Sequence, residues 1–250
     1  LSKDSHIDIL IIPVFLFLSE TFSQLYSFIK EHHKQIYIEF PAVLRKNFLL
    51  KKSELLKQLT AFPCDAYIAC SYDELGLFDE LSIPRDKIIL SPRLYTYSNI
   101  AAMAFDHEGY HLQSIPVELN KAEISHRITQ NSFIQIYGRI PIMTTANCIY
   151  QTCKHCDKQF HEIVLEDRKR SRFLVYNQCD SCYNIIYNSV VTYLLSDISD
   201  LNKLQFYGYR LDFTAENKTE VVSVLSDLSN ALENKVVSSQ TDYTKGHYER

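Results

Sequence analysis

Apolar and polar positions alternate between two periods along the first 140 residues, which indicates strands and helices in turn. Residues 7–14 form a nearly continuous apolar run, which is typical of a strand buried on both faces. Residues 20–33 place their apolar side chains at helical spacing, with Ser19 as the predicted N-cap. The pattern continues with predicted strands at 35–40, 66–70, 87–90, 113–118 and 133–137, and with predicted helices at 53–62 (capped by Ser53), 72–81, 99–108 and 120–128.

The alternation returns after a cysteine-rich segment, with a predicted strand at 205–213 and a predicted helix at 216–232. Seven strand–helix units in 250 residues favour an α/β fold, a TIM-like (β/α) barrel that is complete or slightly irregular. We therefore expect a cysteine-rich insertion before the last strand–helix unit. The predicted parts are a βα-repeat part at 1–139, a cysteine-rich metal-binding segment at 140–192, a closing strand and helix at 193–234, and a polar tail at 235–250.

Composition limits the possible partners without naming one. The chain is 46% hydrophobic, enough for a large core, and its net charge of -4 is not that of a typical nucleic-acid binder. One dense basic run, 167–172, is either a solvated loop or a contact for phosphate or RNA. Only five glycines occur, and none belongs to a dinucleotide-binding or phosphate-loop motif.

The first apolar run does not indicate a membrane protein. It is interrupted by Pro13 and is shorter than the roughly 20 residues of a membrane-spanning helix. Acidic residues precede it and no small-residue cleavage site follows, so it is also a poor signal peptide. We expect a cytoplasmic protein without membrane contact. Because the first residue is Leu, we further expect part of a longer chain.

Cysteine spacing is the strongest chemical signal. Five of the seven cysteines lie between positions 148 and 182, and four of them form the pairs Cys153-x-x-Cys156 and Cys179-x-x-Cys182. Clustered pairs of this kind favour metal binding in a reducing compartment over a disulfide framework. A zinc ion would use the two pairs and leave Cys148 over. An iron–sulfur cluster could instead use Cys148, Cys153, Cys156 and Cys179, and two histidines of the segment, His155 and His161, are further candidate ligands.

Polar residues at predicted strand ends are the candidates for catalysis, because barrel enzymes build their sites there. Glu118 ends the fifth strand and Arg139 ends the sixth. A carboxylate and a guanidinium directed into one barrel mouth could pair or jointly orient a ligand. Any barrel has polar strand ends, so each could equally serve only as a cap or an anchor. Cys64 and Cys70 lie apart from the cysteine cluster and are expected to be small buried residues.

A resemblance to a known family rests on several segments. Residues 137–148, YGRIPIMTTANC, resemble the YG-x-x-P-x-M-x-S-x-x-C stretch of the collagenase-like peptidases, peptidase family U, number thirty-two. The resemblance extends from about residue 35 to about residue 230 and is greatest to the C-terminal half of the long, two-barrel members. Further segments that carry it are 94–99, 116–120, 165–168, 179–188 and 209–216.

The resemblance implies a barrel-like α/β fold and a set of metal-binding cysteines. The family was named for proteolysis, but several relatives carry a four-cysteine iron–sulfur cluster and support oxygen-independent hydroxylation of RNA bases or of a quinone precursor. The peptidase signature, Glu-x-Phe followed by His-Gly and paired cysteines, is not present here. The resemblance therefore implies that this segment is a partner half that supplies structure or a second site. The main site would then lie in the N-terminal half of the same longer protein.

Three hypotheses follow. The first is a domain of an iron–sulfur-dependent, [4Fe–4S]-type, RNA base-hydroxylating enzyme, with RNA as a partner. The second is a collagenase-like protease, which the residues favour less because four thiolates leave a metal no open position and no nucleophile–base pair is recognisable. The third is a noncatalytic half stabilised by zinc.

Overall fold

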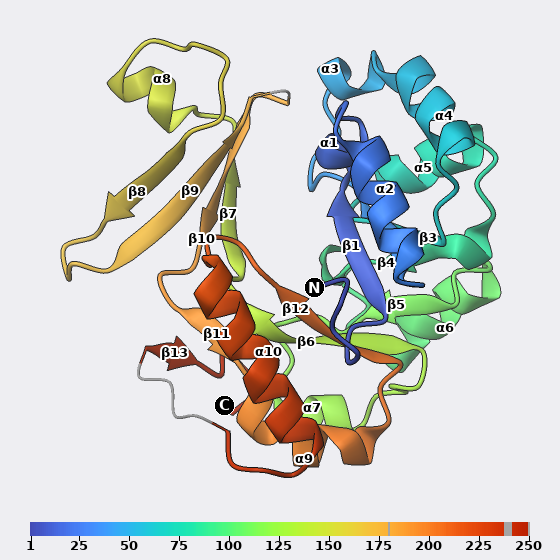
Figure 1. The fold of residues 1–250 in the computed structure, drawn as a ribbon, viewed down its shortest axis with the longest axis vertical. Helices are drawn as coiled ribbons and strands as arrows, with labels where there is room; N and C mark the ends of the chain where they lie inside the picture. The colour runs from blue at the N-terminus through green and yellow to red at the C-terminus, as the bar shows by residue number, and fades with distance from the viewer. Residues whose placement is uncertain (180, 238–241, 250) are drawn as a thin grey trace. The chain divides into compact units, whose positions relative to one another are not determined.

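The computed structural model describes residues 1–179, 181–237 and 242–249 (Figure 1). The chain divides into two compact units, Leu1–Phe133 and Ile134–Arg250. One strand, β6 (Ser132–Gly138), runs across the boundary between them. Within the described residues no helix is both long and apolar enough to cross a bilayer.

Unit 1 is built on a parallel sheet. Each strand pairs in parallel with the next one along the chain, and the start of β6 pairs with β5. These strands are β1 (Ile9–Pro13), β2 (Gln35–Glu39), β3 (Ala66–Ala69), β4 (Ile88–Leu90) and β5 (Leu112–Ser114). The predicted strand at 113–118 is therefore shorter and begins one residue earlier, whereas the predicted alternation of strands and helices is confirmed.

Helices connect the strands of unit 1, as parallel pairing requires. They are α1 (Val14–Phe17), α2 (Phe22–Glu31), α3 (Lys46–Leu49), α4 (Lys52–Ala61), α5 (Tyr72–Glu80), α6 (Asn99–His107) and α7 (Lys121–Ser125), with 3-10 turns η1 (Arg85–Lys87) and η2 (Pro92–Leu94). Two predicted caps are wrong. The N-cap of α2 is Thr21 rather than Ser19, because Ser19 directs its hydroxyl to the carbonyl of Leu16, and α4 begins before Ser53, at Lys52.

Strands β3 and β4 of unit 1 are buried along their whole length and therefore on both faces, which explains their continuous apolar character. Ile36 and Ile38 of β2 pack into the larger core together with the helices, whereas Tyr37 between them belongs to a second, smaller core. The same alternation holds in β4, where Ile88 and Leu90 join the larger core and Ile89 the smaller one. Side chains of period two thus fill two layers, one on each side of the sheet.

Unit 2 begins with the rest of β6, which pairs antiparallel with β11 (Val191–Tyr193). The strand β12 (Gly208–Asp212) also pairs with β6, and β13 (Tyr243–Thr244) pairs in parallel with β11. The long helix α10 (Lys218–Leu232) starts at a capping box formed by Asn217 and Glu220. Short helical turns lie between β11 and β12: η3 (Leu195–Asp197), α9 (Ile198–Leu201) and η4 (Asn202–Leu204).

A separate four-stranded antiparallel sheet fills most of the cysteine-rich segment. Its order is β7 (Pro141–Thr145), β10 (Tyr183–Tyr187), β9 (Arg172–Gln178) and β8 (Glu162–Glu166). A short helix, α8 (Ile149–Cys153), lies between β7 and β8. No strand was predicted in this segment, although Ile163 and Leu165 are half-buried and alternate with exposed residues in β8, the period expected of a half-buried strand.

The observed architecture is a mixed α/β fold with a mostly parallel sheet and a small antiparallel sheet. The α/β class is therefore confirmed. The division into 1–139, 140–192, 193–234 and 235–250 stays a prediction, and residues 238–241 and 250 of the expected polar tail lie outside the described residues.

Candidate metal centre

The topology of the small sheet brings cysteines from distant positions to one end of it. Because the strands run antiparallel, the end of β7, the start of β8, the end of β9 and the start of β10 lie at the same end of the sheet. Cys148 follows β7, Cys156 precedes β8, and Cys179 and Cys182 flank the turn between β9 and β10. The strand ends next to cysteines that are up to 34 positions apart (148 to 182) in the sequence thus lie at the same end of the sheet.

The β9–β10 turn is closed by backbone hydrogen bonds. Gln178 and Tyr183 are the last paired residues before the turn. The amide of Ser181 donates to the carbonyl of Gln178 at 3.1 Å, and the amide of Cys182 donates to the carbonyl of Cys179 at 3.3 Å. Cys182 has a φ of 55°, in the left-handed region that non-glycine residues occupy infrequently. A C-x-x-C pair at such a turn presents two sulfurs from one short segment, as thiolate metal sites require.

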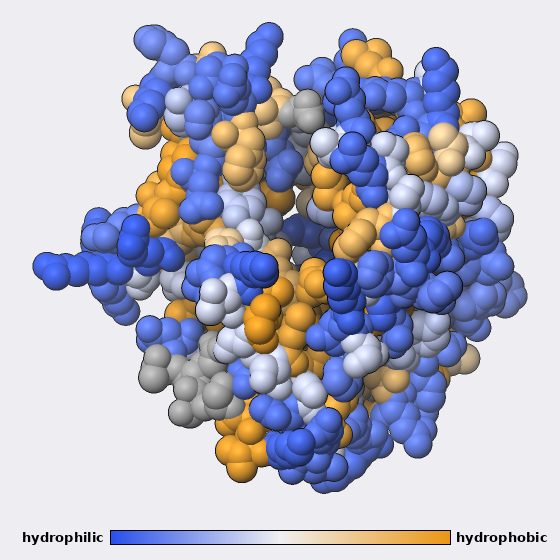
Figure 2. Space-filling model, viewed as in Figure 1, coloured by the Kyte–Doolittle hydropathy of each residue, from blue (hydrophilic) through white to orange (hydrophobic). Residues whose placement is uncertain are grey.

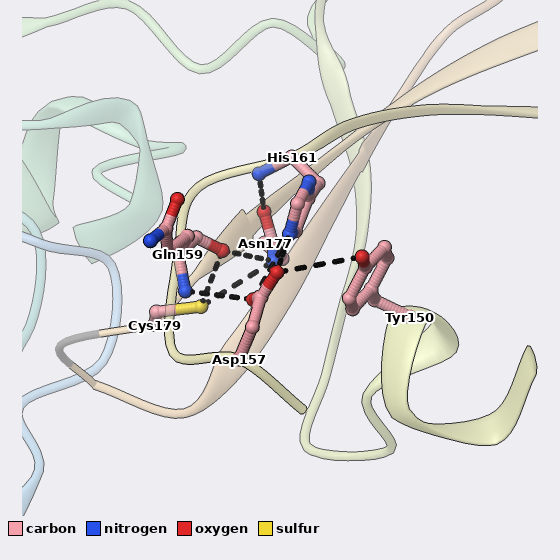
Figure 3. A network of polar contacts seen from close by, with 6 residues as sticks. All are labelled: Tyr150, Asp157, Gln159, His161, Asn177 and Cys179. Carbon is pink, nitrogen blue, oxygen red and sulfur yellow. Dashed lines mark hydrogen bonds and ion pairs between the residues drawn. The ribbon is translucent and has the colours of Figure 1, made fainter. Parts of the chain in front are cut away.

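The Cys179 thiol is held in a polar network (Figure 3). Its sulfur donates to the carbonyl of Gln159 at 3.0 Å and accepts from the Asn177 amide nitrogen at 3.3 Å. Asn177 is buried, donates to the same Gln159 carbonyl at 2.9 Å, and accepts from the backbone amide of His161. A single buried amide thus fixes both the cysteine turn and the segment that leads into β8.

Four cysteines share one electrostatic neighbourhood. Burial raises the pKa of the Cys179 thiol, and the charges of Cys156, Cys148, Asp157 and Cys182 raise it further. Cys153 is the last residue of α8 and is exposed, as are Cys156 and Cys182.

These thiols are neighbours without forming a closed ligand set. Within residues 1–179, 181–237 and 242–249, no three His, Cys, Asp or Glu side chains are placed so that they could hold a metal ion. The two observations differ because charges act over several ångströms, whereas zinc–sulfur bonds are only about 2.3 Å long. A bound metal would require rotation of thiols that already lie at the same end of the sheet.

The segment before β8 is stabilised by a second cluster, around Asp157 (Figure 3). The Asp157 carboxylate accepts from the amide of Gln159 at 3.0 Å, lies 2.8 Å from Nε2 of His161, and accepts from the Tyr150 hydroxyl at 3.4 Å. The Gln159 amide and His161 lower the pKa of Asp157. The rings of Tyr150 and His161 stack with centroids 3.8 Å apart. His161, considered above as a ligand, therefore uses Nε2 to bind Asp157.

Sequence reasoning did not identify Asn177, Asp157 or Tyr150. Asn177 lies within an apolar strand, FLVYNQ, and a polar residue that interrupts such a run is the available signal. Asp157 directly follows Cys156, but an acidic residue in a loop has many possible roles. The structure therefore adds the residues that hold the cysteine-bearing loops.

The two predicted catalytic residues have other partners within their own units. Glu118 is exposed beyond β5 and accepts a hydrogen bond from Tyr97; burial and this carboxylate raise the pKa of the Tyr97 hydroxyl to about 12. Arg139 follows β6, and its Nη1 donates to the carbonyls of Asn188 at 3.1 Å and Ser189 at 2.6 Å. Arg139 thus anchors the chain that leaves β10. A shared ligand for Glu118 and Arg139 stays a prediction.

Cys64 and Cys70 are both buried, as expected. Burial is the largest cause that raises the thiol pKa of each, to about 12 for Cys64. Both are therefore uncharged small core residues at neutral pH.

Comparison with known proteins finds distant structural matches and no family. No family model matches the sequence, and no curated protein matches it. Among solved structures, the chain is similar to the "C-terminal domain of putative chitinase from Desulfitobacterium hafniense DCB-2", with 11% identity, 86% of this chain and 83% of that chain covered, and a TM-score of 0.42. It is also similar to the Bacillus megaterium QM B1551 spore cortex-lytic enzyme SleL, with 11% identity, 94% and 61% covered, and a TM-score of 0.29. At this level of similarity neither match assigns an activity.

Proposed function

We propose that Cys148, Cys156, Cys179 and Cys182 bind one metal centre at the end of the small antiparallel sheet. The observation that supports the proposal is that the strand ends nearest to these cysteines in the sequence lie at the same end of the sheet. Four thiolates form a complete ligand set for either a structural zinc ion or an iron–sulfur cluster. The set differs from both combinations considered from spacing alone, because it contains Cys148 and omits Cys153.

The donor chemistry fits such a centre. All four thiols lie outside the strands, so the loops that carry them can close around a metal without breaking the sheet. Asn177 already donates to the Cys179 sulfur, and hydrogen bonds to ligand sulfurs tune thiolate metal sites. In this set Cys153, the last residue of α8, is not a ligand.

The metal centre is either an iron–sulfur cluster or a zinc ion. The resemblance to the collagenase-like peptidase family supports an iron–sulfur cluster. The C-x-x-C pair at a hairpin turn supports zinc, since zinc ribbons present their cysteines in this way. We favour the iron–sulfur centre and keep zinc as the second candidate.

The same resemblance supports a wider role, as a C-terminal domain of an iron–sulfur-dependent enzyme that hydroxylates or otherwise modifies RNA bases in the cytoplasm. Here the N-terminal half of the same longer protein is the partner, the α/β part is a TIM-like barrel, and Glu118 and Arg139 act on the ligand. A protease is less well supported, because four thiolates leave no coordination position for an attacking water.

Purification without oxygen, followed by metal analysis and a visible spectrum, tests the metal centre. We expect about one cluster per chain with broad absorption in the visible range, or one zinc ion in a colourless protein if the second candidate holds. Protein without iron and without zinc would refute the proposal.

Single Cys→Ser variants test the ligand set. Cys148→Ser, Cys156→Ser, Cys179→Ser and Cys182→Ser should each lose most of the metal. Cys153→Ser is the matched control, because it alters a cysteine of the same segment, and it should retain the metal. Loss of metal in Cys153→Ser together with retention in Cys148→Ser would instead assign the two C-x-x-C pairs.

A further inference from the structure

The hairpin that joins β8 to β9 presents a cluster of cations, here called the basic tip and defined as residues 167–172. The strands pair up to Glu166 and Arg172. Beyond this pair, the amide of Asp167 donates to the carbonyl of Ser171 at 3.1 Å. Figure 1 shows the hairpin extending away from the rest of the small sheet, and Figure 2 shows hydrophilic atoms at its end.

Asp167 builds the turn by itself. Its Oδ1 accepts from the amides of Lys169 and Ser171, each at 2.8 Å, and its carbonyl accepts from the amide of Arg170 at 3.0 Å. These bonds use one acidic side chain and the backbone alone. No basic side chain of the tip is needed to form the turn.

Arg170 occupies a position that favours glycine. Its φ is 65°, the left-handed conformation that commonly ends a three-residue hairpin loop and is usually taken by Gly. Arginine adopts this conformation at a cost, as do seven other non-glycine residues among those described. The turn therefore does not explain why an arginine stands at this position.

The cations of the tip are free to bind an anion. Arg168, Lys169, Arg170 and Arg172 are all exposed, and within the described residues none of them forms an ion pair. Only two carboxylates lie nearby in the sequence, Glu166 and Asp167. Because the whole chain carries a net charge of -4, this positive charge is a local feature and not part of a generally basic surface.

We propose that the basic tip binds the phosphate backbone of RNA; the choice of RNA rests on the proposed function. Guanidinium groups bind phosphate through two parallel hydrogen bonds. Three of the four cations are arginines at the end of a narrow two-stranded ribbon, a shape that can follow a phosphate chain. The tip exposes no aromatic ring for base stacking: Phe173, the nearest, is half-buried. The contact is therefore independent of base sequence and strongly dependent on salt.

The test measures binding of the purified chain to a fluorescent 20-nucleotide single-stranded RNA over a range of salt concentrations. Arg170→Gly is the key variant, because glycine suits the left-handed position and the turn should fold at least as well. The variant Arg168→Ser/Lys169→Ser/Arg170→Gly removes three cations. The matched control, Lys46→Ser/Lys57→Ser/Lys218→Ser, removes the same charge from exposed lysines elsewhere.

We expect Arg170→Gly to weaken RNA binding about threefold or more. The triple tip variant should weaken it at least about tenfold and reduce the slope of log affinity against log salt by about 2. The control should bind within about twofold of the unmodified chain. The proposal is overturned if the unmodified chain does not bind RNA, if the control loses as much affinity as the tip variant, or if DNA of the same sequence is preferred.

Metal analysis of the same samples separates this inference from the proposed function. The tip variants should retain the metal of the unmodified chain. Tip-dependent RNA binding by a chain that holds no metal would support the tip and refute the metal centre. Metal-loaded tip variants that bind RNA as tightly as the unmodified chain would refute the role of the basic tip and leave the metal centre standing.

Discussion

Replacing Asn177 by alanine is the most direct test of how the cysteine-bearing loops are held. The Asn177 side chain is buried and makes three hydrogen bonds: to the Gln159 carbonyl at 2.9 Å, to the Cys179 sulfur at 3.3 Å, and from the His161 amide. A buried hydrogen bond contributes about 1 kcal/mol net, so Asn177→Ala should lower the free energy of unfolding by about 2–3 kcal/mol. The His161 amide and the Gln159 carbonyl would lose their shared partner.

The substitution should also weaken the proposed metal centre. Residues that support metal ligands typically change affinity about 10- to 100-fold when they are removed. Urea unfolding of unit 2, followed by far-UV circular dichroism, gives the stability change, and competition with a chelator gives the metal affinity. The matched control is Tyr193→Phe, which removes a buried 2.8 Å hydrogen bond to Asp227 away from the cysteines. The control should lose about 1.5–3 kcal/mol and keep its metal.

Two results would contradict this reasoning. A stability change below about 0.5 kcal/mol in Asn177→Ala would mean that water replaces the three bonds at little cost. Equal loss of metal in Tyr193→Phe would mean that metal retention follows general stability and not the Asn177 contacts.

Three further predictions concern other parts of the chain. Burial raises the pKa of the Glu74 carboxyl to about 8, so its stabilising effect is present below the ordinary value of 4.5 and is lost as the pH rises to about 8. Between pH 5 and pH 8, the free energy of urea unfolding of unit 1 should fall by about 3–5 kcal/mol more in the unmodified chain than in the Glu74→Gln variant. Parallel pH profiles of the two proteins would contradict this prediction. Gly138→Ala should destabilise unit 2 by at least about 2 kcal/mol in thermal unfolding, because φ is +129° and the new methyl group would lie 2.7 Å from Cβ of Asp212. The control is Gly76→Ala in α5, where nothing lies within 4 Å of the new methyl group. This control should stabilise the chain by about 0.5–1 kcal/mol. Removal of the proposed metal by a chelator should increase amide hydrogen exchange in residues 146–187 and leave the β1–β5 amides protected, because metal binding is coupled to the folding of its own segment; uniform exchange in both regions would argue against a local role.

Much of unit 1 could be predicted from the sequence, because its elements depend on local periodicity. The strand at Gln35–Glu39 and the helix at Tyr72–Glu80 lie within one residue of their predicted bounds. Caps were less predictable. Ser19 and Ser53 both have suitable hydroxyls, but the backbone at each position decides whether the hydroxyl meets a free amide. Thr21 is the N-cap of α2 and Lys51 is the N-cap of α4 instead.

The small sheet was missed for a different reason. Its strands pair over distances that periodicity does not describe: β7 pairs with β10, some 40 residues later. The alternation in β8 is typical of a half-buried strand, but it extends over only five residues. Similarly, the short β11 and β13 have too few residues to stand out, and only their pairing identifies them.

By itself, the sequence determined an α/β protein with a thiol-rich segment, because the spacing of apolar residues and the positions of the cysteines are properties of the sequence alone. Only the tertiary structure decided which thiols become neighbours. C-x-x-C spacing joins Cys153 to Cys156 within one short segment, whereas the order of four antiparallel strands puts the end of β7, which Cys148 follows, at the same end of the sheet as the β9–β10 turn of Cys179. The physical reason is that spacing controls proximity only within a turn, whereas proximity between turns depends on how strands pair, and pairing is settled by the packing of side chains far apart in sequence.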